Sequence, residues 1–281
     1  MGVPTIKIEN ARGEVLNLST DPRYVPILTG TGPPAATINR AKIATADGTR
    51  YNSATVGERN LLLTVYIVRD VARARLNLYR YITTKGYIKL HYKNDGLDVW
   101  IDGYVETAEV DPWTIDQNVQ VSIICPQPYW NDAKETFTDA SHTASAFEFP
   151  FAIPSEGVEL STINVAASTI VRNEGHVETG IIFELYASTR CLQPRIYNLS
   201  TGEYIGFYAD LLQGDRLLIN TADGSKSVTH IRDGVETNYI NTIMEGSSWL
   251  KMAVGVNEYT YAVDEGEMAL GIYHTNKYQG V

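Results

Sequence analysis

The sequence has few of the residues on which covalent and metal chemistry depend. Only two of its 281 residues are cysteine, Cys125 and Cys191, and they lie 66 positions apart. Two cysteines at this distance exclude a zinc ribbon and a redox pair. Because free cysteine often behaves as a small apolar residue, we predict two buried thiols, with a disulfide between them as the alternative.

Positive charge and long apolar runs are also scarce. The 23 Lys and Arg residues against 33 Asp and Glu give a formal net charge of −10. Phosphate backbones and anionic lipid surfaces are bound through clustered Lys and Arg, so we expect no nucleic-acid binding, sequence-specific binding included. No stretch of about 18 apolar residues could cross a bilayer. The N-terminus lacks the basic and apolar regions of a secretion signal, and we expect no membrane insertion.

Catalytic motifs are missing as well. The sequence contains no His-Glu-x-x-His, no Gly-x-Ser-x-Gly and no phosphate-loop lysine motif. Its histidines are scattered singly: His91, His142, His176, His230 and His274. We therefore predict a protein that is not an enzyme, without catalytic residues, metal ligands or cofactor-binding residues. Its function has to be argued from architecture.

Short strands and turns dominate what is present. The 18 Tyr and 22 Gly favour strands and tight turns over long helices. In the first half we predict a hairpin over residues 4–18, a strand over 38–43, a buried strand over 59–68, and a hairpin whose strands flank Asn94-Asp95-Gly96. A last strand ends at Ile123. The first half is thus a mainly antiparallel β domain.

One stretch has helical periodicity. Val71, Ala74, Leu78 and Ile82 follow one another at spacings of three, four and four, which gives one apolar stripe. We expect the side chain of Asp70 to cap this helix. Lys85-Gly86 should end it, with the glycine in the left-handed conformation.

Arginines surround the apolar stripe of this helix. A nucleic-acid patch is one interpretation, but a solvated or subunit-facing surface is favoured. The candidates for a subunit interface are Arg69, Arg73 and Arg80.

The stretch from Ile123 to Asp132 divides the chain. Pro126 and Pro128 stop any sheet or helix pattern, and the composition changes after them. We predict an N-terminal domain over residues 1–132, a proline-containing hinge at its end, and a C-terminal domain over residues 133–281.

The second half contains many short apolar segments separated by turn residues. They are residues 147–151, 163–165, 181–183, 196–197, 204–207, 217–219, 249–250 and 259–261. This pattern is typical of a β-sandwich. Sandwich domains bind sugars by stacking aromatic rings on them, and the candidates for such a contact are Tyr208, Tyr239 and Trp249. The alternative is that these rings fill the core or line an interface.

Several segments together resemble a known family. In the first half they are Gly30-Thr31-Gly32-Pro33-Pro34, Asp47-Gly48-Thr49-Arg50-Tyr51-Asn52-Ser53, Glu58-Arg59-Asn60-Leu61, Leu78-Tyr79 and Pro126-Gln127-Pro128-Tyr129-Trp130. In the second half they are Asn173-Glu174-Gly175, Ile196-Tyr197-Asn198-Leu199-Ser200-Thr201-Gly202-Glu203, Gly214-Asp215-Arg216-Leu217-Leu218-Ile219-Asn220-Thr221 and Gly255-Val256-Asn257. In this order they resemble the distal tail protein (Dit) family, siphophage-type tail components of phages and phage-derived particles of Gram-positive hosts.

The resemblance implies both an architecture and a set of partners. A first "belt" domain, a β-structure with one helix, would close a homo-hexamer into a ring. A galectin-like or carbohydrate-module-like β-sandwich would lie outside it. The ring would join the tail tube protein to the baseplate hub or tail-associated protein at the virion tail tip and organise receptor-binding proteins, after synthesis in the bacterial host cytoplasm. Six copies would carry about −60 (6 × −10), and a lumen of that sign would repel DNA.

Two other functions compete with this one. The chain could be a carbohydrate-binding β-sandwich module protein that recognises host cell-wall sugars. A glycoside hydrolase would need a buried pair of carboxylates, which the sequence does not indicate.

Overall fold

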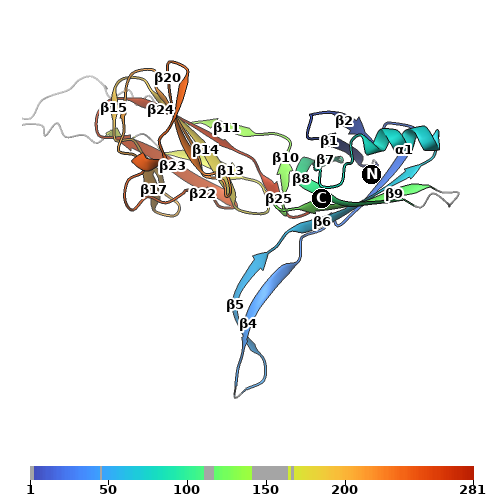
Figure 1. The fold of residues 1–281 in the computed structure, drawn as a ribbon. Helices are drawn as coiled ribbons and strands as arrows, with labels where there is room; N and C mark the ends of the chain where they lie inside the picture. Colours follow the sequence, from blue (N-terminus) through green and yellow to red (C-terminus); the bar gives the residue numbers. More distant parts are fainter. Residues whose placement is uncertain (1–2, 45, 111–116, 141–163, 166–167) are drawn as a thin grey trace, which may run out of the picture. The chain divides into compact units, whose positions relative to one another are not determined.

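The protein forms two compact β-rich units. A computed structural model describes residues 3–44, 46–110, 117–140, 164–165 and 168–281. The first unit comprises Met1–Lys134 and Lys277–Val281, and the second comprises Glu135–Asn276. The strands in both units pair in an antiparallel manner, and one α-helix occurs in the part that the structure describes. The fold is mainly β with a single helix, which confirms the predicted fold class (Figure 1).

The first unit is built on a nine-stranded antiparallel sheet. Its order is β2-β1-β7-β8-β9-β6-β3, and β10 joins it by pairing with both β8 and β25. The strands are β1 (Thr5–Asn10), β2 (Val15–Asn17), β3 (Tyr24–Thr29), β6 (Arg59–Ile67), β7 (Tyr87–Lys93), β8 (Asp98–Val110), β9 (Asn118–Cys125), β10 (Trp130–Asp132) and β25 (Lys277–Tyr278). The predicted hairpins are present: β1 pairs with β2, and β7 pairs with β8. The side chain of Asn94 shapes the second turn by accepting hydrogen bonds from the backbone of Gly96 and Leu97.

Helix α1 (Val71–Tyr79) is shorter than predicted and is capped differently. Its buried residues Ala74 and Leu78 join the core cluster formed by the apolar face of the sheet. Asp70 makes no side-chain cap bond and lies in the left-handed region with φ 49°. The predicted cap is therefore wrong.

The predicted end of the helix is also wrong. Arg80 and Tyr81 already donate backbone hydrogen bonds to carbonyls three residues back, which closes the helix near Tyr79. The left-handed residue further along is Lys85, with φ 67°, and not Gly86. Glycine is required at position 86 because a Cβ there would lie 2.6 Å from the carbonyl oxygen of Thr83.

The second unit is a β-sandwich. One sheet has seven strands, ordered β11-β24-β14-β19-β20-β21 with β22 attached to β14, and the other has five, ordered β12-β23-β16-β17 with β13 attached to β23. The bounds are β11 (Thr136–Asp139), β12 (Asn164–Val165), β13 (Thr169–Asn173), β14 (Thr179–Ala187), β16 (Arg195–Asn198), β17 (Glu203–Gly206), β19 (Arg216–Asn220), β20 (Ser227–Arg232), β21 (Val235–Asn238), β22 (Lys251–Met252), β23 (Gly255–Val263) and β24 (Met268–His274). A small pair, β15 (Cys191–Leu192) and β18 (Asp210–Leu211), and the short 3₁₀ helix η1 (Ile240–Thr242) complete the unit.

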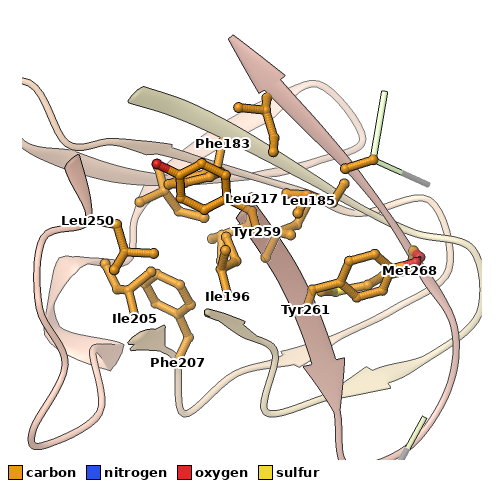
Figure 2. Packing of buried hydrophobic residues seen from close by; sticks show 14 of the residues in the cluster. Phe183, Leu185, Ile196, Ile205, Phe207, Leu217, Leu250, Tyr259, Tyr261 and Met268 are labelled. Carbon is orange, nitrogen blue, oxygen red and sulfur yellow. The ribbon is translucent and has the colours of Figure 1, made fainter. Parts of the chain in front are cut away.

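Side chains from both sheets of the sandwich meet in one core. Figure 2 shows Phe183 and Leu217 from the larger sheet packed with Ile196 and Tyr259 from the smaller one. Phe183 and Tyr259 meet edge to face, with ring centroids 5.6 Å apart. The galectin-like character of the sandwich stays a prediction.

The predicted strands of the second half have mixed outcomes. Residues 181–183, 196–197, 204–207, 217–219 and 259–261 fall in or overlap strands. Residues 249–250 lie just before β22, so they are not a strand, and β20 and β24 were not predicted. Residues 164–165 of the predicted strand 163–165 form β12, whereas residue 163, the predicted strand 147–151 and His142 lie outside the described residues.

The second unit is an insertion in the first. The chain leaves the first unit after β10 and comes back to it in β25, and these two strands pair with each other. The first and last strands of the insertion also pair, because Thr136 of β11 lies opposite His274 of β24. Pro126 and Pro128 precede β10 and thus lie within the first unit.

Both cysteines are buried free thiols, as the sequence predicts. Burial raises the pKa of the Cys125 thiol to about 12, which makes it unreactive. Within the described ranges, no helix is long and apolar enough to span a membrane. The same ranges contain no group of three or more His, Cys, Asp and Glu residues that could hold a metal ion.

A buried carboxylate joins two strands of the sandwich. Asp215, whose side chain is 3% exposed, accepts hydrogen bonds from Nε of Arg232 at 2.9 Å and from the backbone N–H of Leu212 at 2.8 Å. Nε2 of His230 lies 3.0 Å from the same carboxylate. The hydrogen bond from Arg232 is the main cause of a pKa for Asp215 well below its ordinary value.

We expect Asp215→Asn to lower the free energy of unfolding by about 1–3 kcal/mol at pH 7, because the buried carboxylate loses its charge-assisted hydrogen bonds. A lowered carboxyl pKa stabilises the fold above the unfolded-state value near 3.8, and this contribution is lost as the pH falls below it. The difference between wild type and variant should therefore shrink below pH 3.8 in denaturant unfolding. Asp223→Asn is the control, since Asp223 pairs with Lys251 at an exposed site and should cost less than about 1 kcal/mol. Equal losses in the two variants would contradict this account.

Candidate assembly surface

The most exposed regular structure in the first unit is a two-stranded hairpin, here called the arm (residues 36–56). It consists of β4 (Ala36–Lys42) and β5 (Thr49–Val56), which pair only with each other. Every residue of these strands is exposed except Val56, which is half-buried. In Figure 1 the arm runs away from the nine-stranded sheet. Its side chains therefore have no core of their own chain to pack against.

The pairing register gives the arm two unlike faces. Cross-strand partners share a face of a sheet, so Ile38, Arg40, Lys42 and Tyr51 lie on one face through the pairs Ile38–Ala54, Arg40–Tyr51 and Lys42–Thr49. The opposite face carries Thr37, Asn39, Ala41, Arg50, Ser53 and Thr55. A bulge between Asn39 and Arg40 keeps this division along the whole hairpin. One face is thus apolar and basic, and the other is mainly polar.

An exposed hairpin of this kind is incomplete by itself. Isolated two-stranded sheets are at best marginally stable in water, and both outer edges of the arm offer unpaired backbone groups. Ile38 is 51% exposed and Tyr51 is 62% exposed, although each could bury a large apolar area. These features are typical of a surface that another protein covers.

A second open surface of the first unit is the edge strand β3. Among the described strands it pairs only with β6. Val25 and Ile27, on one face of β3, are each 48% exposed. Pro26 lies between them and removes one backbone donor from the free edge, which is a common protection of exposed edges.

Arg59 holds the base of the arm. Its side chain donates hydrogen bonds to the backbone oxygens of Gly30 (2.9 Å), Gly32 (2.8 Å), Pro128 (2.7 Å) and Gln279. The residue is 3% exposed and forms no ion pair with a carboxylate in the part of the chain that the structure describes. Burial lowers the pKa of its guanidinium from the usual value, but an arginine stays charged. The dipoles of four backbone carbonyls, together with the ring of Trp130, whose centroid lies 6.0 Å from the guanidinium carbon, therefore compensate a buried positive charge.

The structure does not gather the three arginines proposed for a subunit interface into one patch. Arg69, Arg73 and Arg80 are all exposed. Arg69 precedes the nine-residue helix and lines a surface depression with Asp21 and Arg23, whereas Arg80 follows the helix. An interface through these residues stays a prediction.

The three aromatic residues proposed for sugar contact lie around η1 and β20. The backbone N–H of Tyr208 donates a hydrogen bond to the carbonyl oxygen of Thr242, and the hydroxyl of Thr242 donates one to the carbonyl oxygen of Tyr239. The ring of Tyr239 lies against His230, with centroids 4.5 Å apart, and Lys226 lies 5.7 Å from the centroid of Trp249. Tyr239 and Trp249 also pack on the sandwich core, whereas Tyr208 is exposed. Contacts within the unit thus already use Tyr239 and Trp249, and sugar binding stays a prediction.

The negative charge of the chain belongs to the second unit. Residues 1–134 and 277–281 contain 16 Lys and Arg against 14 Asp and Glu, or +2, and residues 135–276 contain 7 against 19, or −12. The arm itself has Arg40, Lys42 and Arg50 against Asp47, or +2. A ring built from first units would not be acidic, in contrast to the expectation from the net charge of the chain.

Comparison with known proteins agrees with this architecture. Residues 174–278 match the SPP1 Dit family model, described as a siphovirus-type tail component, C-terminal domain. This match confirms the resemblance drawn from the sequence. A comparison with curated proteins gave no match.

Solved structures extend the likeness of fold to the whole chain. The crystal structure of the Dit (gp 19.1) protein of phage SPP1, described as a paradigm of hub adsorption apparatus in Gram-positive infecting phages, has a TM-score of 0.71 at 15% identity. The similarity covers 98% of this chain and 99% of that one. Baseplate structures of phage p2 in its activated conformation cover both chains fully, with TM-scores of 0.55 at 10% identity for the calcium form and 0.56 at 11% for the strontium form. The fold is Dit-like, and the similarity supports a structural role in a phage tail or baseplate.

We expect Ile38→Ser/Tyr51→Ser to leave the free energy of unfolding of the isolated chain within about 0.5 kcal/mol of wild type, because neither side chain is buried. Leu63→Ala, in the core of the nine-stranded sheet, should cost roughly 2–5 kcal/mol in the same denaturant titration. A large loss from the arm variant would show that the arm packs within its own chain.

Proposed function

We propose that the chain is a structural protein of a phage or phage-like tail, and that six copies form an adaptor ring between the tail tube and the baseplate hub. The second units would project from this ring and support receptor-binding proteins. The Dit-like fold over nearly the full chain length supports the tail role. The arm supports self-assembly, because its side chains are exposed and no other part of the described chain covers them.

Head-to-tail closure of a ring requires two different complementary surfaces on each copy. The first unit offers two open surfaces of unlike kind, the arm and the β3 edge. Its small net charge of +2 lets copies approach one another without long-range repulsion. Assembly through first units therefore fits the distribution of charge between the two units.

Mass photometry of the purified chain tests this function. Wild type should give a species of about 187 kDa, which is six times 31.2 kDa. Ile38→Ser/Tyr51→Ser should shift it to the monomer mass, because the apolar part of one arm face is removed. In intact particles, antibody labelling under the electron microscope should mark the tail tip.

The matched control changes the other face of the same strands. Thr37→Ser/Thr55→Ser removes two methyl groups from the polar face and should assemble like wild type. A wild-type chain that stays monomeric, both in solution and on purified tail tubes, would overturn the ring.

A further inference from the structure

The last five described residues of the first unit, residues 277–281, form a strap across the base of the arm. Two residue pairs of β25 hold the strap to β10, Trp130–Tyr278 and Asn131–Lys277. The hydroxyl of Tyr278 also lies 3.1 Å from the carboxylate of Asp132. Tyr278 and Val281 also pack against the core of the first unit, but a ladder of two residue pairs is short, and a segment held in this way can open locally.

The tip of the strap lies against the loop that leads into the arm. The backbone N–H of Val281 donates to the carbonyl oxygen of Thr31 at 3.1 Å. A Cβ on Gly280 would lie 3.0 Å from both the carbonyl carbon of Gly32 and the carbonyl oxygen of Thr31. Because these are backbone atoms, which cannot turn aside, only glycine fits at position 280 without moving the strap or the loop.

Arg59 joins the strap to both roots of the arm. It is the first residue of β6, which follows β5 after two residues, so it lies at the root of the second arm strand. Its guanidinium binds Gly30 and Gly32 in the loop before the first arm strand, and it also binds Gln279 of the strap. One planar donor group thus fixes three segments in relation to one another.

We propose that Arg59 and the strap form a latch that sets the direction of the arm, so that assembly requires the strap to be docked. Arg59 acts as a positioning residue, and this role rests on the proposed assembly through the arm. Residues 277–281 come after the inserted second unit, whose first and last strands lie side by side. The latch therefore closes only when the insertion has brought the chain back, and it links arm-mediated assembly to a completed fold.

Gly280→Val tests the latch without removing a hydrogen-bonding group. Spin labels on Thr37→Cys, near the base of the arm, and on Lys93→Cys, at the exposed end of β7, report the direction of the arm within the first unit. The native thiols are buried and should not react. In the full-length chain, Gly280→Val should broaden the distance distribution about twofold, because the loop loses its fixed partner.

Gly57→Ala is the matched control. It adds a methyl group at the other root of the arm, between β5 and β6, where nothing lies within 4 Å of the new Cβ, and it should keep the narrow distribution of wild type. The unfolding midpoint of the second unit should be unchanged in both variants. Hydrogen exchange at residues 277–281 shows whether the strap is displaced.

Arg59→Lys shows whether Arg59 and the strap act together. Lysine keeps the charge but cannot reach several carbonyl oxygens with a fixed fork, so this variant should also broaden the distribution. Adding Gly280→Val to Arg59→Lys should broaden it little further, because both changes open the same latch. Independent, additive effects would overturn the latch.

The assembly readout separates the latch from the proposed function. Gly280→Val should lose the species of about 187 kDa, six times 31.2 kDa, whereas Gly57→Ala should keep it. Two results would overturn the latch and leave the ring proposal intact. One is a displaced strap with a distance distribution as narrow as in wild type. The other is a variant with a broadened distance distribution that still assembles. Assembly of Ile38→Ser/Tyr51→Ser would instead contradict the role of the arm, and a wild-type chain that never assembles would overturn both.

Discussion

The first unit depends on one buried positive charge. Removing a guanidinium from water costs several kcal/mol unless hydrogen bonds replace the lost solvation. At Arg59 that replacement comes from four backbone oxygens, in the loop before the arm, in the proline-containing segment and in the strap. If any one of these segments moves away, the guanidinium loses hydrogen bonds and its burial costs more free energy. The segments therefore stabilise one another. This mutual dependence makes the base of the arm a cooperative structure, although it contains little regular secondary structure.

Sequence patterns predicted the parts of the fold that follow from local rules. Asn94-Asp95-Gly96 predicts a hairpin because the Asn94 side chain and the glycine both suit a tight turn. Residues 59–68 predict a buried strand because the run is apolar and rich in β-branched and aromatic residues. The contacts of Arg59 could not be predicted in this way. Its partners lie 27, 29, 69 and 220 positions away in the sequence. The local sequence around Arg59 predicts only that a strand begins there. The insertion of the second unit is hidden for the same reason, since only pairing across the whole chain reveals it.

The arm was only partly predicted because its side chains pack on no core of their own chain. A strand that packs on its own core alternates apolar and polar residues, but β5 has the sequence TRYNSATV and every position is exposed or nearly so. The available signals were Asp47-Gly48 as a turn and the β-branched residues on both sides of it. Such a segment resembles a loop in sequence, and only its paired backbone identifies it as a hairpin.

The two units carry net charges of opposite sign. With −12 in residues 135–276, two second units repel each other at distances below the Debye length of about 8 Å in physiological salt. The first unit carries +2, all of which the arm accounts for, so the remaining first-unit surface is neutral on balance. In the proposed ring, this charge distribution would favour contacts between first units over contacts between second units. The same division keeps the basic, apolar face of the arm from pairing with its own copy, because like charges oppose that contact, and favours a neutral or acidic surface as its partner.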